Sequence, residues 1–398
     1  MATVIQNYCD LKVFLKPYFR VMAILGIHYS PDESTPVETF AVGTSKRTKM
    51  LRWKKIAYKA YQLIVLLLIW LHVLRYTVCL FIAKPIISKS SVYRLCVFCY
   101  CLHASITTTV ILWMFSKEDG FYRFIDQWNG VSKKAASLGC KQEVIGKQVR
   151  RTTRVLLLAM VIVNCTGGVG FLINTKDGNE LIKATLAPFG YSLVGLTYGL
   201  YILQAILWAC SLSFFAVVTK CLTLQFKLVS QEITGLVNTA SSFPGKILQF
   251  TRLHLEMCDL VDLLNQYYKY ILASTFLLNI IVLLCVGYSV IKSALMNLSL
   301  ILMMATISVH GIYNLVSLSL LSANLHEQVH KPLPSLYKLR GQNANLEDVL
   351  EVNLFIAKLQ ESSVGITAMD ILLVKNGTLL TLFGVFLTYL FVVIQFSL

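Results

Sequence analysis

The residues whose types and spacing most directly suggest chemistry lie at His326-Glu327-Gln328-Val329-His330. This is the pattern H-E-x-x-H, which on a helix places two imidazoles on one face to hold zinc while the glutamate serves as general base. Lys331-Pro332 follows at once, and proline ends a helix. A third zinc ligand would have to come from Glu347, Glu351 or elsewhere, and no spacing nominates one. Two interpretations follow: a membrane zinc metalloprotease, or a solvated helix terminus where histidine suits the negative end of the helix dipole.

A second informative set closes the chain, where Thr388-Tyr389 is followed by five apolar residues and then by Gln395-Phe396. These residues end the apolar stretch Ile371–Phe396, which is long enough to cross a bilayer core of about 30 Å. Lipid offers no partner to the Gln395 amide, so we expect it to face a water-filled path or another helix, or else to lie in the interfacial region. At helical spacing Thr388 and Gln395 share one stripe, and Tyr389 and Phe396 share the next. Such a face is suited to lining a pore.

The composition is typical of a polytopic membrane protein. Of the 398 residues, 56% are hydrophobic and only 14% are charged, and the mean hydropathy is +0.65. Soluble domains carry roughly 25% charged residues. We therefore predict an all-α polytopic membrane protein with seven transmembrane helices. The predicted spans are Tyr58–Ala83, Val92–Phe115, Val155–Ile173, Phe189–Val218, Tyr270–Ile291, Ala294–Ser322 and Ile371–Phe396.

Lysine and arginine concentrate in alternate segments between these spans, beginning with the N-terminal segment. The positive-inside rule then places the N-terminus in the cytoplasm and, after seven crossings, the C-terminus outside the cell. This orientation is opposite to that of G-protein-coupled receptors, and no matched pair of broken helices indicates a secondary transporter. The net charge of +16 follows from the same topology. We expect membrane lipids, and no nucleic acid, among the partners.

The predicted cytoplasmic segments also carry helical patterns. Periodicity continues from Lys220 to Lys269 except at Ser241–Gly245, so the fourth and fifth spans are expected to project into the cytoplasm as an antiparallel pair. Asn345 is expected to cap a further helix, with Leu350 and Phe355 on its apolar side. The stretch Leu11–Ile27 is expected to lie along the inner membrane surface. The resulting division is a cytoplasmic N-terminal segment (1–57), a six-helix ligand-binding bundle with cytoplasmic extensions (58–322), a cytoplasmic anchor or assembly segment (323–370) and a pore-lining seventh helix (371–398).

Three stretches resemble insect gustatory receptors. The C-terminal Thr388-Tyr389 and Gln395-Phe396 resemble the signature of that family. Leu15-Lys16-Pro17-Tyr18-Phe19-Arg20 followed by Leu25-Gly26-Ile27 resembles its N-terminal segment, and Arg252-Leu253-His254-Leu255-Glu256 through Leu264-Asn265 resembles the approach to its fifth helix. The resemblance implies a subunit of a ligand-gated, non-selective cation channel in the plasma membrane of sensory neurons, not an enzyme, with no cofactor. A related odorant receptor would share the topology but would not be expected to end in this signature.

The resemblance also implies a homo- or heterotetramer whose seventh helices line a pore. Thr388 and Tyr389 would contribute to the lining, and Gln395 and Phe396 would form an extracellular-side constriction. A ring of Phe396 side chains would keep the closed pore dry, and ligand binding would replace the rings with Gln395 amides. Lys375 departs from the family pattern, because a lysine that faced the pore would repel cations. Its alternatives are to pair with Asp370 or to extend to the cytoplasmic surface.

A ligand pocket is expected among the first six helices, open to the outside. Its candidate residues are aromatic or sparsely polar and lie in the outer halves of the spans. They are Phe171, Tyr191, Tyr198, Tyr288, Asn297 and Met303. The alternative for each is an interfacial belt or a bundle core. Few acidic residues lie in these outer halves, which favours a hydrophobic, bitter-type tastant over a sugar.

Overall fold

The computed structural model describes most of the chain. The described residues are 9–26, 45–82, 89–117, 120–156, 158, 194–239, 245–292, 298–339, 346–361 and 364–395. Helices account for nearly all of these ranges, and one two-stranded hairpin interrupts them. The predicted third span, Val155–Ile173, lies almost wholly outside the described residues.

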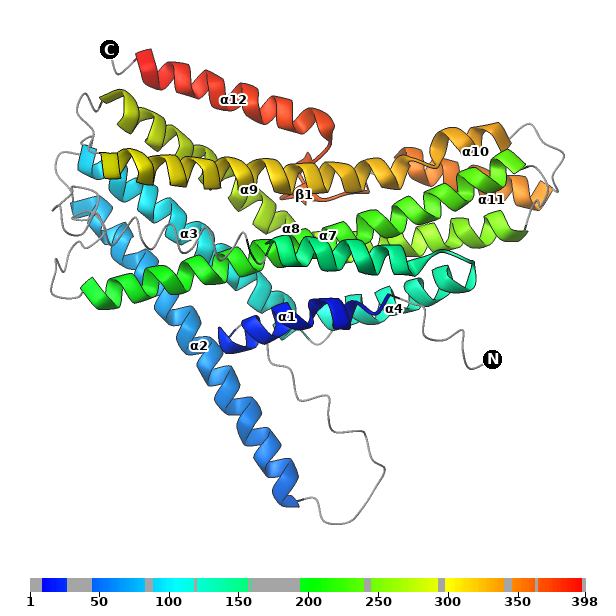
Figure 1. Cartoon of the computed structure of the whole chain (residues 1–398), viewed down its shortest axis with the longest axis horizontal. Helices are drawn as coiled ribbons and strands as arrows, with labels where there is room; N and C mark the ends of the chain where they lie inside the picture. The colour runs from blue at the N-terminus through cyan, green and yellow to red at the C-terminus, as the bar shows by residue number, and fades with distance from the viewer. Residues whose placement is uncertain are drawn as a thin grey trace.

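Two helices far longer than a bilayer is thick form the spine of the molecule. They are α7 (Val194–Thr239), of 46 residues, and α8 (Gly245–Lys292), of 48 residues. At 1.5 Å per residue each is about 70 Å long, more than twice the roughly 30 Å of a hydrocarbon core. The prediction that the fourth and fifth spans continue as a helical pair is therefore confirmed, and Figure 1 shows both running along the long axis.

The other long helices surround this spine. They are α2 (Ser45–Ile82), α3 (Lys89–Ser116) and α9 (Leu298–His330). The most extensive contact joins α3 to α8, and α9 packs on both α7 and α8. Among the described helices, five are long and apolar enough to cross a membrane, and each overlaps a predicted span. These five are Ile56–Phe81, Arg94–Ser116, Gly195–Val237, Lys246–Ile291 and Asn376–Gln395.

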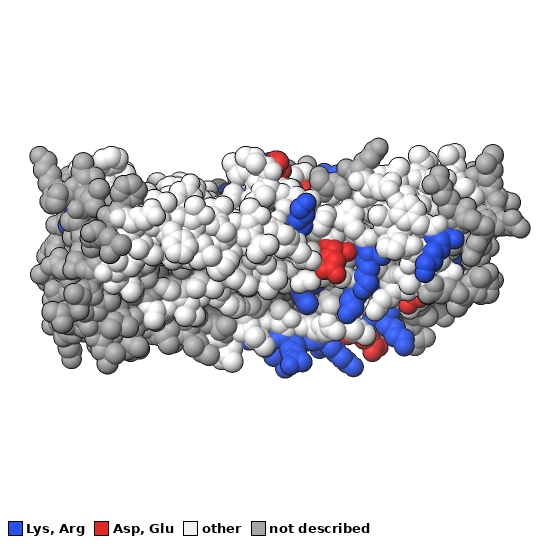
Figure 2. Space-filling view, turned by 90° about the horizontal axis from the view of Figure 1, so that it is seen from above, with Lys and Arg blue, Asp and Glu red and all other residues white. Residues whose placement is uncertain are grey.

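Shorter helices gather at one end of the spine. They are α4 (Phe121–Ser137), residues 142–156, α10 (Leu333–Leu339) and α11 (Leu346–Glu361). On the face seen in Figure 2, the described Lys, Arg, Asp and Glu side chains gather toward the end that carries α10 and α11. Charged side chains avoid the hydrocarbon core. This end therefore lies in water, and the described residues toward the opposite end of this face, which are almost all uncharged, suit the bilayer.

The N-terminal helix α1 (Leu11–Ile24) packs against protein. Its buried residues Leu11, Leu15, Tyr18 and Met22 lie on one side and contact α4 and α7. Trp128 fixes its start, because the indole Nε1 donates a hydrogen bond to the Cys9 carbonyl at 2.9 Å. The helix α1 is thus amphipathic as expected, but its apolar side covers the helical bundle and not the inner membrane surface.

The helix predicted after Asn345 is present as α11, although Asn345 itself lies outside the described residues. Phe355 is buried as expected, as is Leu359 one turn later, but Leu350 is 58% exposed. The apolar side of α11 is therefore centred on later residues than predicted. Arg252 on α8 donates to Glu351 at 2.8 Å and helps to hold α11 in place.

The last span begins later than the predicted Ile371. Strands β1 (Thr367–Ala368) and β2 (Leu372–Leu373) form an antiparallel hairpin, and α12 (Asn376–Gln395) starts only after it. At the turn, Met369 and Asp370 have φ angles of 55° and 60°. Two successive left-handed residues are the geometry of a tight hairpin turn. Hydropathy reads straight through this turn because Ile371, Leu372 and Leu373 are themselves apolar.

Candidate channel helix, its clamp and a lateral cavity

The terminal helix α12 is apolar yet has few neighbours within its own chain. Thr378 and Leu382 are its buried residues, and only 6% of its most apolar stretch is buried. It lies along one side of the bundle, where it contacts α8 and α9 (Figure 1). Apolar surface of this extent must be covered by lipid or by other protein chains. Most of the surface of this helix is therefore free to contact lipid or another chain.

One side of α12 carries small and polar residues. Gly377, Thr381, Gly384, Thr388 and Gln395 recur at helical spacing, and all five are exposed. The hydroxyl of Thr388 donates to the Gly384 carbonyl at 2.9 Å, and that of Thr381 donates to Gly377 at 3.2 Å. These internal bonds let the hydroxyls lie in an apolar setting without other partners. The stripe can line either a helix–helix contact or a water-filled path.

The predicted pore residues are placed as follows. Thr388 and Gln395 lie on this exposed stripe, and Tyr389 is 55% exposed on the adjacent side. Phe396 lies outside the described residues. Lys375 is exposed just before α12, and its backbone N–H donates to Thr378 Oγ1 at 3.1 Å, which begins the helix.

The segment that leads into α12 is held firmly by α8. We call residues 364–375 the terminal hairpin. The Asn265 side chain accepts a hydrogen bond from the Thr367 backbone N–H at 2.9 Å, and its Nδ2 donates to Thr367 Oγ1 at 3.1 Å. One turn further along α8, the Lys269 carbonyl accepts from the Met369 N–H at 3.3 Å. Asn265 and Lys269 are four residues apart, so they present one face of α8 to the terminal hairpin.

An ion pair completes this contact, and it corrects one expectation. The ammonium group of Lys269, not that of Lys375, pairs with the Asp370 carboxylate. A hydrogen bond from Lys269 holds the pKa of Asp370 below its usual range. The turn geometry explains the choice of partner, because it places Asp370 against α8 and leaves Lys375 beyond the second strand. Lys375 therefore does not pair with Asp370.

The first histidine of H-E-x-x-H, His326, holds the same region from α9. Nδ1 of His326 donates to the Val364 carbonyl at 3.0 Å, at the start of the terminal hairpin. The His330 ring lies 4.4 Å from that of His326, and burial together with this neighbour lowers the pKa of His330. Within the described ranges, no group of three or more His, Cys, Asp or Glu side chains is arranged to hold a metal. In this structure His326 joins the end of α9 to the segment before α12.

A buried polar network crosses the bundle between α2, α3 and α7. Nδ1 of His72 donates to Gln204 Oε1 at 2.9 Å. The Gln204 amide in turn donates to the Ile69 carbonyl at 3.2 Å and to Ser105 Oγ at 3.3 Å. At its outer end, Arg75 donates to Thr197 at 2.9 Å. Buried polar groups are stable only when they have such partners, so the network fixes how these helices pack.

A second group of rings lies deeper in the bundle around Trp208. His103 and His310 contact its indole from α3 and α9, with ring centroids 5.2 and 4.4 Å away. The Thr275 hydroxyl donates to Ile271 at 2.7 Å, so His103 Nε2 must be the donor in its 3.1 Å bond to Thr275. In the described part of the chain, neither ring nitrogen of His310 has a hydrogen-bond partner.

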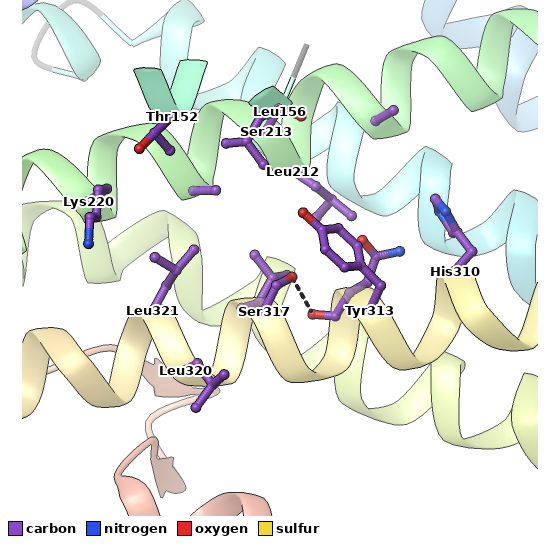
Figure 3. A pocket seen from close by; sticks show the side chains of 14 residues that line it. Thr152, Leu156, Leu212, Ser213, Lys220, His310, Tyr313, Ser317, Leu320 and Leu321 are labelled. Atoms are coloured by element: carbon purple, nitrogen blue, oxygen red, sulfur yellow. Dashed lines mark hydrogen bonds between the residues drawn. The ribbon is translucent and has the colours of Figure 1, made fainter. Parts of the chain in front are cut away.

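His310 also borders a cavity of about 390 Å³ between α7, α9 and residues 142–156. Ligand pockets commonly span roughly 300–1,000 Å³. Tyr313 reaches from α9 toward α7, and Lys220 and His310 lie toward opposite ends of the cavity (Figure 3). The described residues that line it are Thr152, Leu156, Ala209, Leu212, Ser213, Ala216, Lys220, His310, Tyr313, Asn314, Ser317, Leu318, Leu320 and Leu321.

Of the predicted ligand residues, the two whose side chains the structure describes do not line this cavity. Tyr198 on α7 and Tyr288 on α8 are both half-buried. Phe171, Tyr191 and Asn297 lie outside the described residues, as does the side chain of Met303. The outer-half pocket therefore stays a prediction.

Comparison with known proteins decides the family. The family model of the 7tm chemosensory receptors matches residues 15–398, nearly the whole chain. The chain belongs to the 7tm chemosensory receptor family. Its family consists of chemoreceptor channels and not of enzymes, so the metalloprotease interpretation of His326-Glu327-x-x-His330 is wrong. In this chemosensory receptor the pattern lies at a helix end where His326 has a structural role.

The fold of this chemosensory receptor is also seen in solved structures. Two of them are the insect olfactory receptor OR5 from Machilis hrabei, alone and in complex with eugenol. Each is 14% identical, with TM-scores of 0.71 and 0.72, and the match covers 98% of this chain and 100% of that chain. This likeness confirms an all-α membrane protein with the 7tm chemosensory receptor fold. No curated protein matches this receptor significantly.

Sequence reasoning missed the buried histidines and the contacts of the terminal hairpin. His72, His103 and His310 each lie within an apolar span, and an ionisable residue there is by itself a functional signal. That signal was available and could have found both the hydrogen-bonded network around Gln204 and the group of rings around Trp208. No comparable signal pairs Asn265 with Thr367, which lie 102 residues apart in the sequence.

Proposed function

We propose that this receptor is a gustatory receptor, a subunit of a ligand-gated, non-selective cation channel opened by a small-molecule tastant. The observation that carries the proposal is α12, an apolar helix left exposed by its own chain and bearing a stripe of small and polar residues. Lipid alone would not call for Thr388 and Gln395 on that stripe, whereas a pore lining would. The taste branch is supported by the Thr388-Tyr389 and Gln395-Phe396 ending.

In this proposal four subunits, identical or mixed, place their α12 helices around a central pore in the plasma membrane of sensory neurons. Thr388, Tyr389 and Gln395 line it, and Phe396 forms the constriction that opens when ligand binds. Lys375 stands at the cytoplasmic entrance. The positive charge of the Lys375 side chain repels permeating cations there and lowers the conductance. A partner subunit that lacks this lysine therefore raises the current of a mixed tetramer.

The tastant site in this proposal lies in the outer half of the bundle, formed by Phe171, Tyr191, Tyr198, Tyr288, Asn297 and Met303. The olfactory receptor OR5 structure was solved with eugenol, a small molecule, which supports a ligand of similar size. Sparse acidic residues favour a hydrophobic, bitter-type compound. A sugar would require more hydrogen-bonding partners than these side chains supply.

The ligand then acts on the pore through the terminal hairpin. Asn265 and Lys269 belong to α8, which passes through the bundle, while Thr367 and Asp370 lie directly before α12. A shift of α8 relative to its neighbours is therefore transmitted to α12 through polar contacts and a few residues of backbone. This is a defined physical connection between the bundle and the pore helix.

Current recording from cells that express the receptor tests the proposal. We expect Phe396→Ala to raise the current without ligand, because a smaller side chain no longer keeps the constriction dry. Phe383→Ala is the matched control, since Phe383 is 57% exposed and lies on the side of α12 away from Thr388. If Phe396→Ala changes neither basal current nor gating, the proposed gate is wrong.

Two further measurements separate the remaining alternatives. An epitope placed after Leu398 should bind antibody on intact cells, because the positive-inside rule puts this end outside. Staining only after permeabilisation would contradict the proposed topology. A panel of bitter compounds and volatile odorants then distinguishes the branches: responses confined to the volatile compounds would make this receptor an odorant receptor.

A further inference from the structure

The cavity between α7, α9 and residues 142–156 has the features of a binding site separate from the outer-half tastant pocket. Along α9 its lining runs from His310 to Leu321, a length of about 16 Å at 1.5 Å per residue. It extends toward the end of the molecule that carries α10 and α11, where the charged residues gather (Figures 1 and 2). This places it in the half of the bundle that the topology assigns to the inner leaflet.

The deep end of the cavity offers hydrogen-bond donors that have no acceptor. Asn314 is only 5% exposed, and its Nδ2 has no partner in the described part of the chain. The neighbouring His310 ring is buried with both nitrogens unpartnered there. A buried donor without an acceptor costs about 1–3 kcal/mol. An oxygen acceptor of a bound molecule beside Asn314 would remove that cost.

The opposite end of the cavity carries a cation. Lys220 lies at the end opposite His310 (Figure 3), three turns along α7 from Ala209, and is half-buried. Residues 142–156, which contribute Thr152 to the lining, also carry the exposed Arg151 and Arg154. This end therefore attracts an anion. Between the two polar ends the lining is apolar, with Leu156, Leu212, Leu318, Leu320 and Leu321.

The cavity borders an apolar outer surface. Two of its lining residues, Tyr313 and Leu320, are 48% and 45% exposed. They belong to an exposed stripe of α9 that also contains Val309, Ile312 and Val316 at helical spacing. Such a stripe must be covered by lipid or by another chain. Where lipid covers it, a molecule reaches this cavity from the bilayer and must partition into it. A small hydrophilic compound is therefore disfavoured.

We propose that this cavity binds an anionic amphiphile from the inner leaflet. Its anionic head pairs with Lys220, its apolar chain lies along the leucines, and an oxygen on that chain accepts a hydrogen bond from Asn314. Two sources share this chemistry: a free fatty-acid-like anion with a hydroxyl on its chain, and an anionic phospholipid with its ester carbonyls. Binding here does not depend on the proposed taste function.

The test uses purified full-length receptor in phosphatidylcholine nanodiscs, labelled with photoreactive octadecanoate. Peptides that contain residues 209–220 and 310–321 should carry the label. Unlabelled 12-hydroxyoctadecanoate should compete about tenfold better than octadecanoate, because only the former carries a chain oxygen that can accept a hydrogen bond from Asn314. The methyl ester of 12-hydroxyoctadecanoate should compete weakly, because it has no negative charge to pair with Lys220. Equal competition by acid and ester would overturn the proposal, as would label spread evenly over all spans.

Variants locate the two contacts. Lys220→Gln should reduce labelling by the acid about tenfold and leave labelling by the photoreactive methyl ester unchanged, which also shows that the variant is folded. Lys227→Gln is the matched control, because Lys227 is exposed on the same helix and does not line the cavity. Asn314→Leu should remove the advantage of the hydroxylated competitor. If Lys220→Gln and Lys227→Gln behave alike, the site is wrong.

Nanodiscs that contain phosphatidylserine distinguish the two sources. If phosphatidylserine lowers labelling of the wild-type receptor but not the residual labelling of Lys220→Gln, the occupant is a resident anionic lipid. If labelling is unaffected, the occupant is the free amphiphile. Labelling is measured without any current recording. A failure of this proposal is thus distinguishable from a failure of the channel proposal.

Discussion

Loss of the Asn265 side chain should loosen the terminal hairpin while the rest of the fold stays intact. Asn265→Ala removes the acceptor of the Thr367 backbone N–H and the donor to Thr367 Oγ1, at 2.9 and 3.1 Å. At roughly 0.5–1.5 kcal/mol for each hydrogen bond, the hairpin loses about 1–3 kcal/mol of local stability. The ion pair between Lys269 and Asp370 remains, so the hairpin is weakened and not released.

Hydrogen exchange measured by mass spectrometry on receptor in nanodiscs checks this magnitude. Because exchange from a locally opened segment follows its opening free energy, 1–3 kcal/mol corresponds to about 5- to 150-fold faster exchange. The change should be confined to peptides that cover residues 364–375. Gln249→Ala is the matched control, since Gln249 is an exposed amide on the same helix.

Two results would refute the reasoning. Exchange in residues 364–375 that stays within twofold of the wild-type rate would mean that Asn265 does not hold the terminal hairpin. Faster exchange across all helices would mean that Asn265 supports the whole bundle. In the expected case, ligand-evoked current should also fall, because α12 is then less firmly connected to α8.

Three further predictions concern the same region. The depressed pKa of Asp370 means that its ion pair with Lys269 contributes stability above the ordinary carboxyl pKa of about 3.9 and loses it as pH falls through the lower folded value. Exchange protection of the terminal hairpin, corrected for the intrinsic exchange rate, should therefore be constant from neutral pH down to the ordinary carboxyl pKa and should fall at lower pH. The variant Asp370→Asn should show no such fall. Met369→Asn should increase the exchange protection of the terminal hairpin several-fold, because a left-handed conformation costs an L-residue roughly 1–2 kcal/mol and asparagine tolerates it best after glycine. Protection that rises no more than in a Met369→Leu control would contradict this. Gly287→Leu should displace α12 and alter basal current, since even a Cβ at Gly287 would lie 2.9 Å from Leu390 Cδ1, whereas Gly199→Leu, with nothing within 4 Å, should behave as wild type.

The contacts of α8 and α9 with the terminal hairpin give a structural role to residues for which local sequence patterns predict a different role. His326 belongs to a zinc-binding pattern, yet its Nδ1 is bonded to the Val364 carbonyl. Asp370 is adjacent to a predicted span and near Lys375 in sequence, yet it pairs with Lys269 on α8. In both cases the partner lies far away in the sequence and becomes a neighbour only when α8, α9 and the terminal hairpin pack together. A local pattern has no access to that choice.

The amino-acid sequence by itself determined the class of protein and the course of the chain through the membrane. Hydropathy and helical periodicity depend on neighbouring residues, so they predicted the spans, the extended pair α7 and α8, and an apolar last helix with Thr388 and Gln395 on one stripe. Only the tertiary structure decided where α12 begins, because the turn at Met369 and Asp370 is stabilised by contacts with α8 and not by its own residue types. The cavity beside Lys220 and Asn314 likewise exists only where three separate segments fail to fill the space between them.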